Sequence, residues 1–340
     1  MIRDAWKGLL KIIKSLFNVD NVLVFLTKKG FKMIDKILIN KLEMESLILY
    51  SRDEGLLFDN SKDETINIRS IAKFVTSLAC GILIDMTKGD FNEDTLIYDI
   101  LKDKINISNK KNLSKLKNIR VRDCLTHTMG YRDIILMSKD IEDLDKDRLL
   151  EYTLSYPLYF EPGEEFLYSN AGYYVLAATM QEYLGYDLYE FINKNIFSKV
   201  GINNPRWDRY GKYLVGASKL YLKPDDLLKL GKIVINDGVY DSERIVSSEW
   251  IGKIASKLYK NEKDYIDQSY LANDYYGYSL WTSKDGVTYA SGSGGQYLIF
   301  LKKEGIIIVA CNAGDSNKVP AIKNQLDSII KSLREEENGL

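Results

Sequence analysis

The chain has 340 residues, of which 45% are hydrophobic and 28% are charged, a composition ordinary for a globular protein in water. This length favours about two domains or sub-domains. The formal net charge of -1 excludes the strong global field that would attract nucleic acid, so we expect no nucleic-acid partner.

Cysteine and histidine are scarce. Cys80, Cys124 and Cys311 are odd in number and widely spaced, which argues against a disulfide framework and favours a reducing, cytoplasmic location. His127 is the single histidine, so a zinc site would need nearly every such side chain to converge. We therefore expect no metal and no cofactor.

Residues 1–40 are expected to be mostly helical. Trp6, Leu9, Ile13 and Phe17 recur at helical spacing within residues 1–17, and lysines fall largely elsewhere on the wheel. The segment lacks the features of a secretory signal, and no apolar stretch approaches the roughly 18 residues that span a bilayer. One interpretation packs this amphipathic helix on the fold; the other gives it weak contact with a membrane surface.

The following elements alternate between strand-like and helical patterns. Residues 45–50 and 55–58 predict a hairpin, and residues 70–86 predict an amphipathic helix. Short helices and turns continue to about residue 240. Four strands are then predicted, followed by a closing helix: 276–281, 287–290, 297–301, 306–311 and, for the helix, 318–335.

This order indicates an α+β fold in which N- and C-terminal strands form one antiparallel sheet, flanked by helices. We expect residues 41–69 and 241–340 to form the sheet sub-domain and residues 70–240 a mostly helical sub-domain. Residues 1–40 precede them within one catalytic domain. The active site should lie in the cleft between the two parts.

Ser70 and Lys73 are the first candidate pair. A serine is a poor nucleophile until a base takes its proton, and residues three apart share one face of a helix. At a helix start, the positive end of the helix favours an alkoxide and disfavours a charged lysine, and the Ser70 N–H can donate to an oxyanion. The spacing S-x-x-K also occurs at Ser108, Ser114 and Ser328, so position at the start of a long helix distinguishes Ser70.

Two further stretches could complete a site. Tyr168 could relay a proton and Asn170 could hydrogen-bond the lysine or a substrate carbonyl, although Tyr168 could equally be one of 24 tyrosines that merely caps a helix. Glycines in the run from Ala290 to Gln296, between two predicted strands, are typical of close approach of a ligand to backbone. The alternative there is a plain glycine-rich hairpin.

Together these motifs resemble the penicillin-recognising serine hydrolases, the family of penicillin-binding proteins and serine β-lactamases. The resemblance covers residues 45–335 and is strongest to the class C β-lactamase-like branch. Its motifs here are Ser70-Ile71-Ala72-Lys73, Leu125-Thr126-His127-Thr128-Met129-Gly130 and Tyr168-Ser169-Asn170, with weaker similarity at Pro224-Asp225-Asp226-Leu227 and from Ile245 to Trp250. It implies a β-lactamase/transpeptidase-like fold.

The resemblance also implies roles for individual residues. Ser70 would be acylated, Lys73 and Tyr168 would manage its proton, and Asn170 would orient them. The backbone N–H groups of Ser70 and Ser293 would form the oxyanion hole. In the strand edge that binds substrate, Ser291 and Gly292 would lie beside Ser293, and His127 would be scaffold.

The third motif departs from the family pattern. Where the family usually has K-T-G or H-T-G, this chain has Ala290-Ser291-Gly292, so a cation that binds a substrate carboxylate is absent. A buried, unpaired carboxylate is costly, which disfavours penicillins and D-Ala-D-Ala peptides. The A-S-G-x-G-G-Q form most resembles the esterases and amidases that include 6-aminohexanoate-dimer hydrolase.

The leading hypothesis is therefore a serine hydrolase that cleaves a small ester, amide or short peptide through an acyl-Ser70 intermediate. One alternative is a β-lactamase or D-alanyl-D-alanine carboxypeptidase whose cation comes from elsewhere in the chain. Another is a retired hydrolase that binds a peptide or cell-wall fragment without turnover.

Overall fold

The computed structural model describes residues 22–27, 30–35, 41–262 and 267–335 of the chain. The helices are α3 (Ala72–Thr87), α4 (Ile97–Leu101), α5 (Leu113–Leu116), α6 (Val121–Leu125), α7 (Leu149–Ser155), α8 (Ala171–Leu184), α9 (Leu188–Ile192), α10 (Pro224–Ile235), α11 (Ser248–Ile254) and α12 (Val319–Glu335). Shorter 3-10 turns are η1 (Arg69–Ile71), η2 (Lys110–Asn112), η3 (Lys146–Arg148) and η5 (Ser316–Lys318), and η4 (Asn193–Phe197) is a π-helical turn.

The strands are β1 (Val22–Thr27), β2 (Gly30–Asp35), β3 (Ser46–Ser51), β4 (Gly55–Asp59), β5 (Ile66–Asn67), β6 (Arg206–Trp207), β7 (Arg209–Tyr210), β8 (Tyr213–Leu214), β9 (Leu220–Leu222), β10 (Val239–Tyr240), β11 (Glu243–Arg244), β12 (Tyr259–Lys260), β13 (Tyr275–Tyr276), β14 (Trp281–Thr282), β15 (Thr288–Gly292), β16 (Gln296–Leu301) and β17 (Ile306–Cys311).

The central element is an 8-stranded antiparallel sheet with the order β12-β13-β14-β15-β16-β17-β3-β4. The two ends of the chain meet inside it, because β17 pairs with β3 in a register that sets Val309 opposite Ile48. This confirms the predicted sheet of N- and C-terminal strands and the predicted α+β class. The hairpin, the helix after Ser70 and the closing helix also lie where the sequence predicts them.

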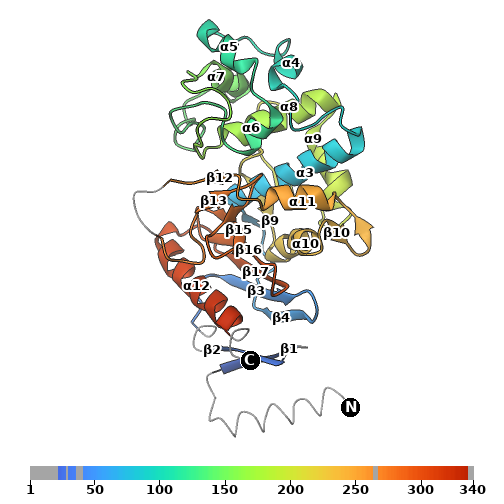
Figure 1. Cartoon of the computed structure of the whole chain (residues 1–340), viewed down its shortest axis with the longest axis vertical. Coiled ribbons are helices and arrows are strands. Elements are labelled where there is room, and N and C mark those ends of the chain that lie inside the picture. Colours follow the sequence, from blue (N-terminus) through green and yellow to red (C-terminus); the bar gives the residue numbers. More distant parts are fainter. Residues whose placement is uncertain (1–21, 28–29, 36–40, 263–266, 336–340) are drawn as a thin grey trace.

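Both faces of this sheet are covered, because successive residues of its central strands pack into two different cores. On β16, Leu298 and Phe300 pack into the core shared with α3 and α10, whereas Ile299 packs against α12 residues such as Ile322. All six residues of β16 are buried. The sheet is thus a middle layer, with α12 on one side and α3, α10 and α11 on the other (Figure 1).

The helices α4 to α9 gather at the end of the molecule away from α12 (Figure 1). Here α8 packs closely on α6, since a Cβ on Gly172 would lie 2.3 Å from the Cys124 carbonyl oxygen. The buried Tyr173 hydroxyl donates to the Leu125 carbonyl at 3.0 Å. Glycine in α8 therefore sets the distance between the helices that precede and follow the Tyr168 stretch.

The predicted division into a sheet sub-domain and a mostly helical sub-domain stays a prediction. The packing of α10, however, differs from what that division implies. Although α10 falls within residues 70–240, it packs on β3, β16 and β17. Gly231 allows this contact, because a Cβ there would lie 3.1 Å from Leu298 and 3.2 Å from Ile307.

Residues 22–27 and 30–35 correct the expectation that residues 1–40 are mostly helical. They form the hairpin β1–β2, paired from Val22 opposite Asp35 to Thr27 opposite Gly30. The sequence reason is the β-branched and aromatic content of Val22, Val24 and Phe25, which favours strand over helix. The predicted amphipathic helix of residues 1–17 lies outside the described residues.

The stretch Arg69–Thr87 also corrects an expectation, because it is long and apolar enough to cross a membrane by length and composition. In the fold, however, α3 is the core helix. Every residue from Ala72 to Leu83 is buried. Its apolar character is explained by burial on all sides.

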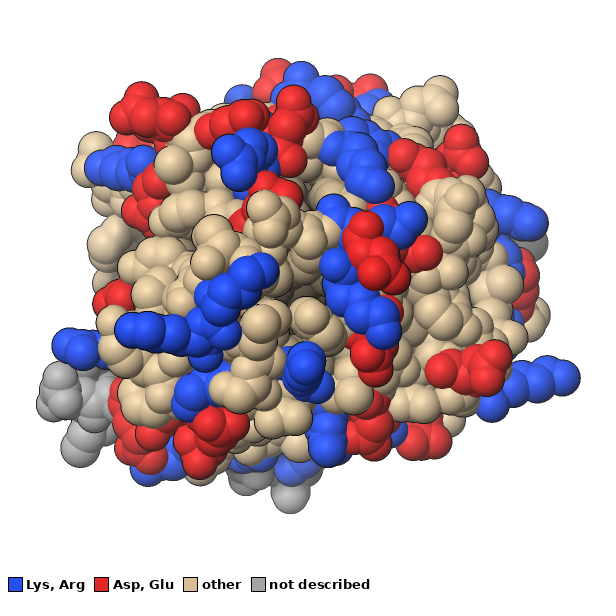
Figure 2. Space-filling view, turned by 90° about the horizontal axis from the view of Figure 1, so that it is seen from above, with Lys and Arg blue, Asp and Glu red and all other residues tan. Residues whose placement is uncertain are grey.

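The surface at the helical end of the molecule carries charges of both signs, interspersed. Figure 2, which looks down on the helical end, shows Lys and Arg alternating with Asp and Glu rather than a patch of one sign. Exposed pairs of this kind include Arg122 with Asp94, and each adds little to stability.

Candidate active site

Ser70 lies in the 3-10 turn η1, two residues before α3 begins at Ala72. The preceding Arg69 has a φ of 53°, which is uncommon for a residue with a side chain. Its N–H donates to the Asn67 side chain at 2.9 Å, so a local hydrogen bond holds this turn. The sharp turn, rather than a regular helix start, therefore presents the Ser70 hydroxyl.

Lys73 follows one turn later and its side chain is fully buried. Its Nζ lies 3.2 Å from Ser70 Oγ, 2.9 Å from Asn170 Oδ1 and 3.1 Å from the Ala217 carbonyl oxygen. Burial lowers the pKa of Lys73 to about 7, because desolvation disfavours the charged amine. A large fraction of this amine is thus neutral near pH 7.

The contacts of Lys73 suit the neutral form. A neutral amine has two N–H donors and one lone pair. The Asn170 and Ala217 oxygens can only accept, so they take the two N–H groups. The lone pair is left to face Ser70 Oγ, where it can accept the hydroxyl proton. The lysine is arranged as a base toward Ser70.

Tyr168 lies beside both Lys73 and Ser70. Burial raises the pKa of Tyr168 to about 12, and a hydrogen bond with Ser70 acts in the opposite direction. Its ring centroid lies 4.9 Å from Lys73 Nζ. Since the phenol keeps its proton at neutral pH, Tyr168 is a donor that can deliver a proton, not a base that takes one.

Asn170 ends the loop that carries Tyr168 and immediately precedes α8. Its amide nitrogen donates to the Leu136 carbonyl at 2.9 Å, which turns its oxygen toward Lys73. The structure thus brings Ser70, Lys73, Tyr168 and Asn170 together.

His127 packs against the loop that carries Tyr168 and Asn170 and accepts hydrogen bonds from it. The Ser169 N–H donates to His127 Nδ1 at 3.4 Å, and the Leu167 N–H donates to the His127 carbonyl at 3.0 Å. The imidazole is buried, and its centroid is 4.5 Å from that of the Tyr168 ring. Burial, with a smaller effect of Lys73, holds the pKa of His127 well below its usual range, so the ring is neutral. These contacts suit the scaffold role predicted for it.

The edge of β15 faces the same turn. Gly292 has no room for a side chain, because a Cβ would lie 2.9 Å from both Arg69 Cβ and the Ile68 carbonyl oxygen. This close approach brings the Ser291–Ser293 backbone beside Ser70, where N–H groups could face an oxyanion. The glycine-rich run is therefore more than a loose hairpin.

Two buried amides fix the turn after Gly292. Gln296 Oε1 accepts from the Gly294 N–H at 3.1 Å, and its Nε2 donates to the Asn312 carbonyl at 2.5 Å. Asn312 Nδ2 in turn donates to the Gly294 carbonyl at 2.7 Å. Hydrogen bonds from the neighbouring strand thus hold the backbone that carries Ser293.

A cavity of about 660 Å³ opens over these residues. It is lined from the helical part by Tyr168, Asn170 and Met137, and from the sheet by Trp281 and Ser291–Ser293. The volume is in the range of small-molecule sites. A cavity between the sheet and the helical part is what the sequence predicts.

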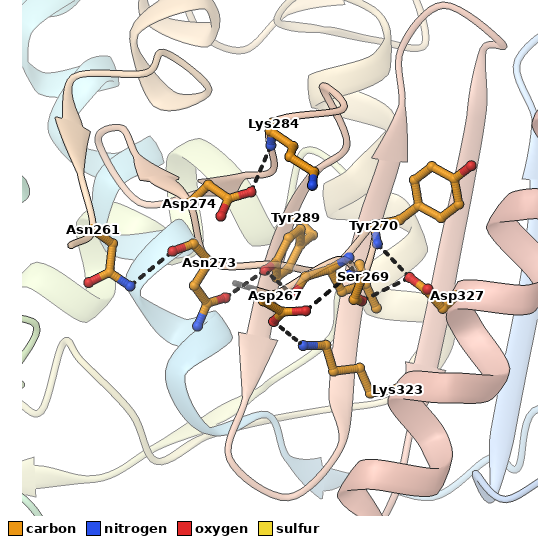
Figure 3. Close-up of polar contacts among 11 residues, drawn as sticks. Asn261, Asp267, Ser269, Tyr270, Asn273, Asp274, Lys284, Tyr289, Lys323 and Asp327 are labelled. Atoms are coloured by element: carbon orange, nitrogen blue, oxygen red, sulfur yellow. Dashed lines mark hydrogen bonds and ion pairs between the residues drawn. The ribbon is translucent and has the colours of Figure 1, made fainter. Parts of the chain in front are cut away.

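Figure 3 shows the polar network that holds one wall of this cavity. Asp327 on α12 accepts from Ser269 Oγ at 2.8 Å and from the Tyr270 N–H at 2.6 Å. Asn273, which lines the cavity, has its Oδ1 2.5 Å from the Tyr289 hydroxyl on β15. The backbone carbonyl of Asn273 accepts from Asn261 Nδ2 at 2.9 Å. The wall is thus anchored to α12 through Asp327 and to the sheet through Tyr289.

Ala290, where the family usually has a cation, is 3% exposed and packs in the core. It offers the cavity no charge. In the part of the chain that the structure describes, no group of three or more His, Cys, Asp or Glu side chains could hold a metal ion.

Some contributors to the site carry no signal in the sequence. The carbonyls of Ala217 and Leu136 orient Lys73 and Asn170, but a backbone oxygen has no letter of its own. Arg69 and Trp281 also line the cavity. Arg69 could have been noticed as the neighbour of Ser70, whereas Trp281 is placed only by the pairing of β14 with β15.

The family model described as Beta-lactamase matches residues 59–329, most of the chain, and the chain belongs to this family. Penicillin-binding protein 4* of Bacillus subtilis (strain 168) is 30% identical over 147 residues, which are 36% of this chain and 31% of that protein. Lovastatin esterase of Penicillium rubens is 32% identical over 94 residues, 28% of this chain and 23% of the esterase. The matched segments thus span less than a third of each of these relatives.

Among solved structures, a candidate 6-aminohexanoate-dimer hydrolase from Bacillus anthracis superposes with a TM-score of 0.67. The match has 17% identity and covers 94% of this chain and 86% of that one. At this identity the likeness shows the fold, which is the β-lactamase/transpeptidase-like fold that the motifs predict.

Proposed function

We propose that this chain is a serine hydrolase that cleaves an ester or amide through an acyl-Ser70 intermediate. The observation that carries the proposal is the environment of Lys73: a buried amine with a pKa of about 7 whose acceptors leave its lone pair toward Ser70. Such a base makes the hydroxyl a nucleophile.

The steps follow from the positions of the side chains. Ser70 Oγ forms a bond to the substrate carbonyl carbon as its proton passes to Lys73 Nζ. The oxyanion that develops is met by the backbone N–H groups of Ser70 and Ser293. As the bond to the leaving group breaks, Tyr168 gives its proton to that group and is reprotonated from Lys73. A water molecule then attacks the acyl carbonyl carbon as its proton passes to Lys73 Nζ, and the bond to Ser70 Oγ breaks as Lys73 returns that proton to the Ser70 oxygen, which releases the carboxylic acid.

Penicillin-binding or β-lactamase activity is the second candidate, favoured by the similarity to penicillin-binding protein 4*. This activity would need a cation from a position other than Ala290, because the third motif holds none. A covalent adduct with benzylpenicillin, detected as a mass increase on Ser70, would select this alternative.

The third candidate is a retired hydrolase that binds a ligand without turnover. The intact set of Ser70, Lys73, Tyr168 and Asn170 argues against it.

The direct test is hydrolysis of p-nitrophenyl esters by the Ser70→Ala variant. We expect kcat/KM to fall at least about 1,000-fold, in line with the loss of a serine nucleophile in other hydrolases. The matched control is Ser328→Ala, which removes the serine of another S-x-x-K string on the exposed side of α12. Ser70→Ala with more than a tenth of the original activity would refute the proposal.

A further inference from the structure

Arg69 is a half-exposed cation next to Ser70. It takes part in no step of the proposed reaction. It lines the cavity, and it precedes Ser70 directly. Among the residues that the structure describes, its guanidinium makes no ion pair and no hydrogen bond. Its backbone N–H, by contrast, is fixed by Asn67. The charge is therefore free for a ligand.

Two glycines leave room for the Arg69 side chain. A Cβ on Gly292 would lie 2.9 Å from Arg69 Cβ, and a Cβ on Gly314 would lie 3.5 Å from Arg69 Nη2. The side chain thus runs from the η1 turn past the end of β15 to the loop after β17. A side chain at position 292 would crowd it, whereas a Cβ at position 314 would be in ordinary van der Waals contact with it.

The other charges of the cavity are already engaged. In its described lining they are Lys219 and Glu262. Lys219 Nζ lies 5.0 Å from the Tyr210 ring centroid, so its charge rests on an aromatic face. Glu262 pairs with Lys260 at 2.9 Å. The described lining therefore has a net positive charge, and Arg69 is its unengaged member.

We propose that Arg69 binds a carboxylate of the substrate and replaces the cation missing at Ala290, so that the substrate is a carboxylate-bearing ester or amide. This inference rests on the proposed function and narrows it to a substrate class. A guanidinium presents paired N–H donors that match a carboxylate, and such charge-assisted bonds are the stronger hydrogen bonds. The cation would reach the same cleft from η1 instead of from β15.

The test compares matched esters that differ by one carboxylate. On the leaving-group side the pair is 3-carboxyphenyl butanoate and phenyl butanoate. On the acyl side it is mono-(4-nitrophenyl) glutarate and 4-nitrophenyl pentanoate. We expect the wild type to prefer the carboxylate ester in at least one pair. In Arg69→Gln, the ratio of kcat/KM for charged over neutral ester should fall at least about tenfold, as expected for loss of a hydrogen bond to a charged group.

Arg69→Lys should recover part of the ratio, because it keeps the charge but not the paired donors. The control is Arg148→Gln, which removes an exposed arginine paired with Glu151 beside α7 and should leave the ratio unchanged. A ratio that stays within threefold in Arg69→Gln for both pairs, or a wild type that prefers the neutral ester in both, would overturn the inference.

A binding measurement separates failure of this inference from failure of the proposed function. Calorimetry with Ser70→Ala and 3-carboxyphenyl butanoate or mono-(4-nitrophenyl) glutarate needs no turnover. We expect at least one of the two to bind, with a Kd that rises at least about tenfold when Arg69→Gln is added. If no ester is hydrolysed yet this rise is seen, carboxylate binding stands and the acyl-enzyme proposal fails. If neither ester binds, or Kd is the same with and without Arg69, carboxylate binding fails.

Discussion

At the scale of single residues, the surroundings of Lys73 matter more than its spacing from Ser70. Three other serines have a lysine three residues later, and nothing in those strings alone distinguishes them. In the fold, only the pair at Ser70 places the amine on the Asn170 and Ala217 oxygens within a buried environment. Desolvation then moves the pKa of Lys73 to about 7.

This pKa predicts the pH dependence of the reaction. A lysine whose pKa is lowered in the fold is protonated, and so inactive as a base, below that pKa and neutral above it. Thus kcat/KM should rise tenfold per pH unit well below pH 7 and level off above about 7. Stopped-flow or steady-state ester hydrolysis from pH 5 to 9 measures this profile.

The variant Lys73→Arg is the matched check on that profile, because a guanidinium stays charged throughout this range. It should lose activity at every pH without a new midpoint. A wild-type profile that is flat from pH 5 to 9, or one that falls as pH rises through 7, would contradict the assignment of Lys73 as the base.

At the scale of elements, the end of β15 is held against the η1 turn by the absence of a side chain at Gly292. This contact places the backbone next to Ser293 beside the turn that carries Ser70, the two residues whose N–H groups we propose as the oxyanion hole. An oxyanion hole depends on donors placed to within a few tenths of an ångström, so this contact matters for catalysis.

Gly292→Ala should therefore impair catalysis more than folding. The added methyl would meet Gln296 Oε1, Arg69 Cβ and the Ile68 carbonyl oxygen, so these groups must shift. We expect kcat to fall at least about 100-fold, the effect of a lost oxyanion donor. The cost in unfolding free energy should be about 1–3 kcal/mol, typical of overpacking. Enzyme assays and thermal melts measure the two effects.

Gly252→Ala on α11 provides the control, since nothing lies within 4 Å of a Cβ there. Alanine in an exposed helix position should leave kcat unchanged and stabilise slightly. Equal kcat values for the two variants would show that the β15 edge does not shape the site.

The elements also show what sequence patterns can and cannot predict. The strands from 297–301 and 306–311 alternate between two buried faces, and their apolar runs identify them directly. The prediction of helix is wrong for the residues of β1 and β2, because apolar residues at this spacing fit a helix as well as a strand. The Ser70 turn is 3-10 rather than α-helical, since the hydrogen bond from Arg69 to Asn67 decides the local geometry.

At the scale of the whole molecule, the sheet and the helical part share one core. A single cluster of buried residues includes Leu298 of β16, Phe74 of α3 and Tyr173 of α8. The cavity lies between parts that a continuous apolar core holds together. The four catalytic candidates come from two separated segments, so only this packing brings them into contact.

A shared core predicts one cooperative unfolding transition. Trp207, Trp250 and Trp281 lie in different parts of the fold, so tryptophan fluorescence and far-ultraviolet circular dichroism should give coincident curves in urea. Chains longer than about 150 residues often populate folding intermediates, so a single transition is not the default result for a chain of this length. Two separated midpoints would show that the helical part unfolds independently of the sheet.

The central claim is that Ser70 is the nucleophile, and covalent labelling tests it most directly. Treatment with a fluorophosphonate, followed by proteolysis and mass mapping, should place one phosphonyl group on Ser70. The label should be absent from Ser70→Ala, and much slower in Lys73→Met because the base is gone. Labelling at any other serine, or full labelling of Ser70→Ala, would contradict the account.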